Sequence, residues 1–266
     1  SITCKTTISQ RKRSKDNPTL RVRSMNSIPS SYSMGVYERQ QKEKQIIQSA
    51  ISLFSSKGYH ATKMDDVAKQ SRMSKGLIYF YFKNKEDLYM AVTKKAYDEL
   101  RNVFKETAKP KDKKGIDLVM DLVNNFIKFT SENRMYHEAI MNFMGIITLY
   151  NDENLRSKID PLILESANFQ KLLEIHHDPA KLGTQIISLG IQDGSMRSDL
   201  QPEATFYTVW TMMIGFERLR GPIEYEGKEV KISSESWKKG FFKLLYVMLQ
   251  GTIQGPKPQV VQGSLF

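Results

Sequence analysis

The sequence contains a single cysteine and no long apolar run, and both absences exclude whole classes of protein. Cys4 alone cannot build a disulfide framework, a thiolate zinc site or an iron–sulfur site within this chain. Ala139–Asn151 and Ala204–Phe216 are apolar segments of thirteen residues without a charged residue, and no uncharged segment of the sequence exceeds fourteen residues. A membrane-spanning helix needs about 20 apolar residues, so we expect these two segments to be buried helices of a globular domain.

Motifs of the common enzyme classes are also absent. The sequence has no G-x-S-x-G nucleophile elbow, no G-x-G-x-x-G dinucleotide fingerprint and no phosphate-binding loop. Glu174 and His177 form one Glu-x-x-His pair, whereas a ferritin-like di-iron site needs two such pairs and two further glutamates. Because adjacent helical residues cannot both face one metal, we expect His176 and His177 to be surface residues near a helix end. The sequence therefore predicts no catalytic residue, no metal site and no cofactor.

A secretory signal is missing as well, because no apolar segment follows the basic residues near the N-terminus. We therefore expect a cytoplasmic protein without membrane contact. Residues 1–37 show no apolar periodicity and are rich in Ser, Thr, Asn, Lys and Arg, which predicts a basic disordered extension or arm. The helical pattern begins directly after Met34, so the alternative is a natural start at Met34, with residues 1–33 not native.

The sequence does have an excess of positive charge, and this excess lies at one end of the chain. The net charge is +11, of which residues 1–37 carry +6, residues 38–90 carry +4 and residues 91–266 carry only +1. A basic N-terminal third followed by a nearly neutral remainder indicates that the N-terminal third binds a polyanion such as nucleic acid. On charge alone, a solvated basic tail on an ordinary domain is the alternative.

Residues 38–90 have the pattern of closely spaced helices. A first helix is expected from Glu38 to Gly58, which is placed to end it in the left-handed conformation. Its apolar face recurs at helical spacing and consists of Ile46, Ile47, Ala50, Leu53 and Phe54.

Two short helices are expected to follow. The first would begin at a Thr62 cap and end by Ser71, and the second would begin at a Ser74 cap. Two short helices joined by a turn of three or four residues, after a longer supporting helix, form the helix-turn-helix arrangement. The residues expected to face inward are Val67, Ala68, Ile78 and Phe82.

The second short helix would enter a major groove, and its outward face is unusual. A solvated helix rarely exposes so many apolar and aromatic groups, so we interpret this face as a contact surface. The alternative is that Phe80 and Tyr81 pack against neighbouring helices. The outward positions are Lys75, Gly76, Leu77, Tyr79, Phe80 and Tyr81.

The run Thr62–Leu88, TKMDDVAKQSRMSKGLIYFYFKNKEDL, resembles the DNA-binding domain of the tetracycline-repressor (TetR) family. The resemblance implies an all-α fold: an N-terminal three-helix helix-turn-helix DNA-binding domain, residues 38–90, and a C-terminal helical ligand-binding and dimerisation domain, residues 91–250. Residues 251–266 would be a tail. The likeness rests on nine positions at the family's spacing, namely Val67, Ala68, Ser74, Gly76, Tyr79, Tyr81, Phe82, Lys85 and Leu88.

The resemblance also implies roles for individual residues in binding a double-stranded DNA operator. Lys75, Gly76 and Leu77 would approach base edges, Gly76 by letting backbone come close and Leu77 by meeting a thymine methyl group. Phosphate contacts are implied for four residues: Thr62 through its hydroxyl at a helix N-terminus, Tyr79, Tyr81 and Lys85.

The turn between the two short helices departs from the family pattern. The family's Ala-Gly-Val is here Ser71-Arg72-Met73, so Arg72 stands where glycine is usual. If its φ is positive, this residue costs about 1 kcal/mol. The alternative is a reshaped turn, and in either case the Arg72 side chain would be placed to reach the DNA backbone.

The rest of the chain has the pattern of a helical domain. The helix from Glu86 to Lys109 is the only element expected to connect this domain with the DNA-binding domain. In the family, the last two helices of each subunit form a four-helix bundle between subunits, which implies a homodimer through helices 202–219 and 235–250. Six further helices are expected at about 115–131, 133–150, 153–176, 179–193, 202–219 and 235–250.

The middle helices are rich in methionine and aromatic residues. Because methionine adapts its shape, such helices could line a promiscuous apolar pocket; a plain hydrophobic core is the alternative. A polar handle on the ligand would be met by Tyr136, His137 or Glu217. The residues expected to bind the ligand are Phe126, Met141, Met144, Ile147, Phe169, Trp210 and Met213.

Two functions remain. One is a ligand-responsive DNA-binding transcriptional regulator, most often a repressor in this family, that binds a palindromic operator as a dimer and is released by a small apolar or aromatic effector. The other is a ligand-independent dimeric DNA-binding or architectural protein whose large domain only dimerises. A cavity among the middle helices would favour the first function, and a filled core would favour the second.

Overall fold

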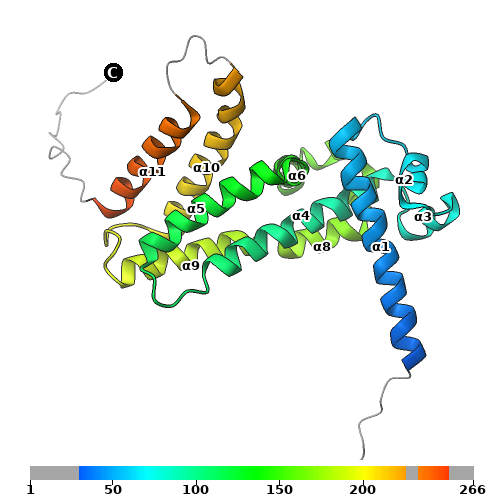
Figure 1. Cartoon of the computed structure of the whole chain (residues 1–266), viewed down its shortest axis with the longest axis horizontal. Helices are drawn as coiled ribbons and strands as arrows, with labels where there is room; N and C mark the ends of the chain where they lie inside the picture. The colour runs from blue at the N-terminus through cyan, green and yellow to red at the C-terminus, as the bar shows by residue number, and fades with distance from the viewer. Residues whose placement is uncertain (1–29, 226–232, 252–266) are drawn as a thin grey trace, which may run out of the picture. The chain divides into compact units, whose positions relative to one another are not determined.

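The computed structural model describes residues 30–225 and 233–251, and every regular element in these two ranges is a helix (Figure 1). The all-α prediction is therefore confirmed. Cys4, most of the predicted extension and the tail after Gly251 lie outside the described residues. Within the described ranges, no helix is both long enough and apolar enough to cross a membrane.

The helices are, in chain order, α1 (Ser30–Lys57), α2 (Met64–Ser71), α3 (Lys75–Tyr81), α4 (Lys85–Thr107), α5 (Gly115–Glu132), α6 (Arg134–Asn151), the 3-10 helix η1 (Arg156–Lys158), α7 (Pro161–Leu164), α8 (Ala167–Ile175), α9 (Asp178–Gln192), α10 (Pro202–Tyr225) and α11 (Ser234–Gln250). Side-chain oxygens accept backbone N–H groups at several N-termini, as capping requires. Ser74, Asn84, Ser166 and Ser233 cap α3, α4, α8 and α11 in this way.

The first helix begins earlier than its apolar pattern indicates. α1 starts at Ser30, so residues 30–37, which we expected in the extension, are helical. Adding a residue to an existing helix gains a hydrogen bond without a new nucleation step, so polar residues can prolong it. The chain divides into two compact units within α1: residues 1–42 belong to the first unit, and Glu43 and all later residues belong to the second.

The segment expected as one helix over residues 153–176 is instead three short helices, η1, α7 and α8. Pro161 stands at the N-terminus of α7, where a proline is tolerated because its missing N–H would have no helical partner. Ser166 starts a new helix by accepting the N–H groups of Asn168 and Phe169. α10 also differs from expectation, because it continues to Tyr225 rather than ending at residue 219.

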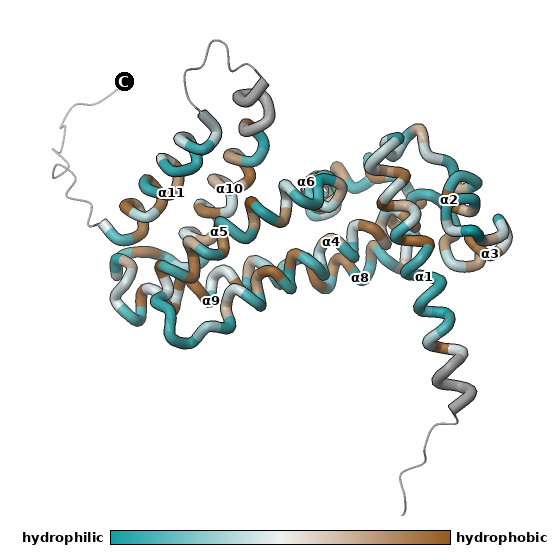
Figure 2. Tube along the Cα trace, viewed as in Figure 1, coloured by the Kyte–Doolittle hydropathy of each residue, from teal (hydrophilic) through white to brown (hydrophobic). Residues whose placement is uncertain are grey.

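α4 is the central helix of the second unit. It packs against α5, α6, α8 and α9, and Figure 2 shows apolar residues recurring along it between polar ones. In its first turns the ring of Tyr89 contacts that of Phe54 on α1, with the ring centroids 5.9 Å apart, and its later turns contribute to the same continuous core. The fully buried apolar residues of α4 are Leu88, Met90, Val92, Ala96, Leu100 and Phe104.

The N-terminus of α5 is held against the end of α9. The Gly115 N–H donates to the Asp193 carboxylate at 2.7 Å, and the Ile116 N–H donates to the Ser195 hydroxyl at 3.1 Å. A side chain at Gly115 would collide with the backbone of Gly190, so glycine is required for this close helix crossing. α5 and α9 are therefore fixed to each other at this end of the domain.

Candidate nucleic-acid interface and effector cavity

The turn between α2 and α3 adopts the conformation in which glycine is usual. Arg72 has φ 55° and ψ 40°, which is left-handed backbone. The turn closes with two hydrogen bonds, from the Arg72 N–H to the Lys69 carbonyl (3.1 Å) and from the Met73 N–H to the Ala68 carbonyl (3.0 Å). The turn keeps the left-handed geometry despite the arginine, and the Arg72 side chain is exposed.

The start of α2 differs from the prediction. Thr62 does not cap α2: it is buried, and its hydroxyl donates to the Gly58 carbonyl at 2.8 Å. The N-cap position belongs to Lys63, whose N–H donates to the Asp66 carboxylate at 3.0 Å. The Thr62 hydroxyl satisfies a carbonyl at the end of α1, so it is not available to a phosphate. The signal for the true cap was Asp66, three residues after Lys63.

The cap and the buried face of α3 agree with the prediction, and its outward face agrees in part. Ser74 accepts the Leu77 N–H at 3.2 Å, and Ile78 and Phe82 are buried. Lys75, Gly76, Tyr79 and Phe80 are exposed, whereas Leu77 and Tyr81 are half-buried. Phe80 keeps 65% of its surface exposed and contacts the ring of Tyr81, so it is not a core residue. The outward face of α3 is an exposed aromatic and basic surface.

Two lysines predicted to contact DNA have partners within the chain. Lys75 lies 2.9 Å from the Asp65 carboxylate, which raises the pKa of Lys75. Lys85 donates to the carbonyl of Tyr59 at 3.0 Å and lies over the Tyr59 ring, 4.4 Å from its centroid. Lys85 therefore fixes the loop between α1 and α2, a role that the sequence did not reveal. Exposed cations that sequence reasoning did not select are Lys63, Lys69 and Lys83.

A cavity of about 230 Å³ lies among the helices of the larger domain. Of the seven predicted ligand-binding residues, Met144, Ile147 and Trp210 line it. The remaining four do not line this cavity: Phe126, Phe169 and Met213 are fully buried core residues, and Met141 packs against the core. The full lining is Tyr97, Leu100, Met144, Ile147, Thr148, His176, His177, Pro179, Ala180, Phe206, Tyr207 and Trp210.

The histidines that line the cavity were not among the residues predicted to meet a polar group of the ligand. The predicted handles Tyr136, His137 and Glu217 do not line this cavity, whereas His176 and His177 do. His177 is exposed, as predicted, but His176 is half-buried, which corrects its assignment to the surface. The reason is that both histidines lie in the turn between α8 and α9, where residues of α4 and α6 also line the cavity.

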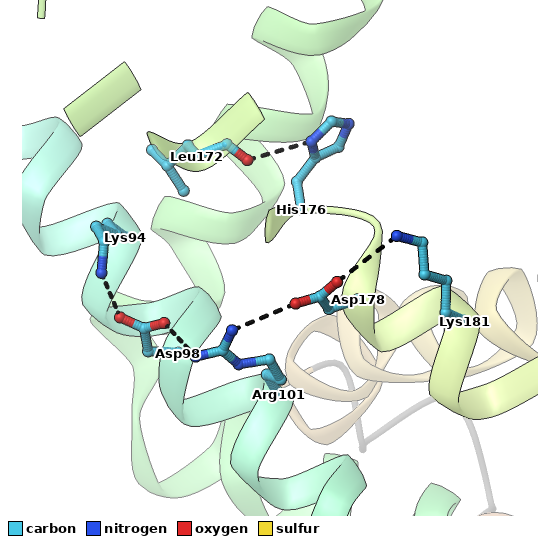
Figure 3. Close-up of polar contacts among 7 residues, drawn as sticks. All are labelled: Lys94, Asp98, Arg101, Leu172, His176, Asp178 and Lys181. Carbon is cyan, nitrogen blue, oxygen red and sulfur yellow. Dashed lines mark hydrogen bonds and ion pairs between the residues drawn. The ribbon is translucent and has the colours of Figure 1, made fainter. Parts of the chain in front are cut away.

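His176 also closes the end of α8. Its Nδ1 lies 3.2 Å from the Leu172 carbonyl (Figure 3) and 3.0 Å from the Leu173 carbonyl. The Leu172 carbonyl also accepts the backbone N–H of His176 at 3.0 Å, so the ring adds a second contact to the last turn of α8. Burial, followed by the neighbouring His177, lowers the pKa of His176, and the two carbonyl contacts offset part of this effect.

A chain of ion pairs connects α4 to the start of α9 beside the cavity. Arg101 contacts Asp98 at 3.0 Å on its own helix and Asp178 of α9 at 3.3 Å (Figure 3). Lys94 pairs with Asp98 at 2.7 Å, and Lys181 lies 3.9 Å from Asp178. Asp178 directly follows the two cavity histidines, so this network fixes their position relative to α4.

A second polar contact joins α8 to α4 at the opposite end of α8. The buried Asp87 carboxylate, in the first turn of α4, accepts the Ser166 hydroxyl at 2.6 Å and the Asn168 amide at 3.2 Å. It also accepts the Lys83 N–H, from the loop after α3, at 3.3 Å. The sequence predicted α4 as the only connection between the two domains. The structure corrects this, because α8 reaches the same junction.

The chain is similar to known proteins in sequence and in structure. Residues 46–92 match the family described as bacterial regulatory proteins, tetR family. The fatty acid metabolism regulator protein of Bacillus subtilis is 26% identical over 166 residues, which cover 61% of this chain and 75% of that protein. The biofilm operon negative transcriptional regulator IcaR of Staphylococcus aureus is 36% identical over 93 residues, 34% of this chain. The chain spans 50% of the length of IcaR, and 20% of that of YuxN, an HTH-type regulator of B. subtilis.

Solved structures agree in fold. A transcriptional regulator of the TetR/AcrR family from Thermobifida fusca superposes with a TM-score of 0.57 at 22% identity, covering 77% of this chain and 97% of that one. FadR from B. subtilis, solved in complex with stearoyl-CoA, gives a TM-score of 0.53 at 19% identity, covering 77% and 98%.

The helix-turn-helix of α2 and α3, carried on a helical body, defines a DNA-binding protein of the helix-turn-helix class. Residues 46–92 match the tetR family, and the relatives and solved structures to which the chain is similar are transcriptional regulators. Its relatives are transcriptional regulators, and such proteins act by binding rather than by catalysis.

Proposed function

We propose that this chain is a ligand-responsive regulator that binds a palindromic operator as a dimer and is released by a small apolar or aromatic effector, most simply as a repressor. The observation that carries the proposal is the combination in one chain of an exposed α3 face and an apolar cavity, joined by α4 and α8. The cavity favours this function over a ligand-independent architectural protein, whose larger domain would need only a filled core.

Lys75, Gly76 and Leu77 are proposed to read base edges. An added Cβ at Gly76 would meet no atom of the protein within 4 Å, so packing within the chain does not require glycine there. Close approach of the backbone to DNA would explain it. Phosphate contacts are proposed for Tyr79, Tyr81 and Arg72. On binding DNA, the Lys75 side chain would leave its ion pair with Asp65 and contact the DNA instead.

Dimerisation is proposed through α10 and α11. Both helices expose large apolar residues, which a monomer rarely leaves in contact with water as a group. Leu244 is 70% exposed and Val247 57% exposed on α11. Tyr207 and Leu219 are both 53% exposed on α10. A two-fold dimer would bring the two α3 helices to symmetric half-sites, which is why we expect a palindrome about one helical turn apart or slightly more.

Coupling between cavity and DNA is proposed to run through α4 and α8 together. Trp210, Met144 and His176 would contact the effector, and His176 ends α8. The N-terminus of α8 is bound to α4 through Ser166 and Asp87, near the DNA-binding domain. The start of α9, which follows α8 after the two cavity histidines, is bound to α4 through Asp178 and Arg101. An effector that displaces α8 would therefore move the first turn of α4 and change the separation of the α3 helices.

Selection of binding sites from random DNA tests the DNA-reading part. The full chain should select a palindrome. Gly76→Ala should fold normally, because its Cβ has space, yet bind the selected site at least about tenfold more weakly, since the methyl group would stand between backbone and bases.

Gly145→Ala is the matched control, because Gly145 is an exposed helical glycine of α6 with equal space for a Cβ. It should leave DNA affinity unchanged. Selection of asymmetric or random DNA by the full chain, or equal affinity of the two alanine variants, would contradict the proposal.

A further inference from the structure

We propose that the effector is an apolar, preferably aromatic molecule carrying a neutral hydrogen-bond donor, such as a phenolic hydroxyl or an indole N–H, and that this group donates to Nε2 of His176. This inference rests on the proposed function, because it names the class of effector for the same cavity. It follows from the hydrogen bonding of one histidine and from the chemistry of the walls around it.

The tautomer of His176 is fixed by its contacts. A backbone carbonyl can only accept a hydrogen bond, so Nδ1, which lies 3.0 Å from the Leu173 carbonyl and 3.2 Å from the Leu172 carbonyl, carries the proton. In a neutral imidazole the other nitrogen then keeps a lone pair. Nε2 of His176 is consequently an acceptor on the opposite side of the ring from the α8 carbonyls.

The surroundings keep this imidazole neutral. Its ring is half-buried, and its centroid lies 3.8 Å from that of His177. Lys181 of α9 also disfavours a positive charge at this position. Asp178, the acid at the start of α9, is engaged by Arg101 and Lys181. Together, burial, His177 and Lys181 lower the pKa of His176, so at neutral pH it accepts a hydrogen bond and carries no charge.

The other walls do not suit a charged ligand. α4, α6 and α10 contribute Leu100, Met144, Ile147 and Trp210, with the hydroxyl-bearing Tyr97, Thr148 and Tyr207, and none of these carries a positive charge that could form an ion pair with a carboxylate. An ionised group placed against such walls without a partner would be strongly disfavoured. The ring centroid of Trp210 lies 5.1 Å from that of Phe126 and 6.0 Å from that of Phe206. Such a group of aromatic rings favours a ligand that is itself flat and aromatic.

Three probes of one shape separate the possibilities: 2-naphthol, which donates a hydrogen bond; 2-methoxynaphthalene, which does not; and 2-naphthoate, which is anionic. Calorimetric titration of the full chain at neutral pH should give an affinity for 2-naphthol about tenfold above that for 2-methoxynaphthalene, the usual effect of one buried hydrogen bond. 2-Naphthoate should bind most weakly.

His176→Phe keeps a ring of similar size without the acceptor, and it should abolish the preference for 2-naphthol over the methyl ether. His177→Phe is the matched control and should retain the preference. A second measurement requires no variant: the binding heat of 2-naphthol should be equal in buffers of different protonation enthalpy, because no proton is taken up.

Each outcome has a distinct meaning when operator affinity is measured beside binding. Tightest binding by 2-naphthoate, or uptake of a proton with 2-naphthol, would overturn the effector class. The proposed function would survive that result if the acid released the operator. If 2-naphthol binds with the expected preference but leaves operator affinity unchanged, the donor site stands and the sensor function fails. Binding of none of the three probes would overturn the inference.

Discussion

Arg72 holds left-handed backbone, although its side chain is long and its Cβ is crowded by the following carbonyl in that conformation. No other non-glycine residue within 30–225 and 233–251 has a positive φ. The turn hydrogen bonds to Lys69 and Ala68 keep the conformation in place. Arg72 is an exposed cation next to the proposed reading helix, and the phosphate contact proposed for it would offset the cost of the backbone strain.

Arg72→Gly should therefore stabilise the protein and weaken DNA binding. Relief of the strain should raise the free energy of unfolding by about 1 kcal/mol, measured by urea denaturation. The slope of log affinity against log salt should fall by about one unit, because one phosphate contact is lost.

The control is Lys69→Gly, at an exposed position within α2, which should lower the free energy of unfolding by about 1 kcal/mol. Equal destabilisation by both variants would show that the turn stores no strain at Arg72.

At this scale the sequence predicts buried faces well and polar partners poorly. Val67, Ala68 and Ile78 are buried as their spacing requires. Thr62 and Lys85 lie at positions that match the family motif, yet their side chains bind carbonyls of the chain itself, at Gly58 and Tyr59. A motif gives the residue type at a position, whereas the hydrogen-bond partner depends on a loop whose path the periodicity does not determine.

Among the helices, α8 is short, and α4 contacts both its N-terminus and the start of α9, which follows its C-terminus. Ser166 and Asn168 hold its N-terminus to the buried Asp87, and Asp178, just after its C-terminus, pairs with Arg101. α8 therefore spans the distance between the cavity histidines and the DNA-binding domain. The apolar pattern over residues 153–176 predicted helical structure but not this division, which depends on Pro161 and on the cap at Ser166.

Breaking one end of this connection should uncouple ligand from DNA. Arg101→Met keeps the apolar stem and removes the contact with Asp178. The factor by which saturating 2-naphthol lowers operator affinity, within the usual range of about 5–150-fold, should then fall at least about threefold.

Arg134→Met is the control, because Arg134 forms an exposed pair with Glu138 on α6, at 3.1 Å. It should leave the coupling factor unchanged. If Arg101→Met retains full coupling, α4 alone transmits the effect of the ligand.

For the whole molecule, the exposed apolar residues of α10 and α11 are the main feature that a single chain leaves unexplained. Leu244→Glu should abolish the dimer in analytical ultracentrifugation and weaken operator binding by at least about 100-fold, since two half-sites would no longer be bound by one particle.

Leu162→Glu is the matched control, because Leu162 is an exposed leucine of α7 outside the proposed interface (40% exposed, against 70% for Leu244). It should change neither property. A Leu244→Glu variant that remains dimeric would place the interface elsewhere.

The sequence predicted that a cavity would be present but not which of the apolar residues would line it. Methionine and aromatic residues at helical spacing predicted an apolar pocket, and Met144, Ile147 and Trp210 do line one. Phe126, Phe169 and Met213 have the same residue types and spacing but are core. Whether an apolar side chain fills the core or lines a cavity depends on how the helices cross, and the local pattern does not contain that information.

The contact between α5 and the end of α9 has a consequence for how the chain folds during synthesis. The acceptors that complete the first turn of α5, Asp193 and Ser195, lie 78 and 79 residues further along the chain. A ribosome finishes α5 long before it makes these residues, so the N-terminus of α5 waits without its cap while α6, α7 and α8 emerge. Closing so long a loop lowers the conformational entropy of the chain, and contacts between neighbouring residues do not compensate for this loss. The contact between the N-terminus of α5 and the end of α9 therefore forms late, after α9 has been made.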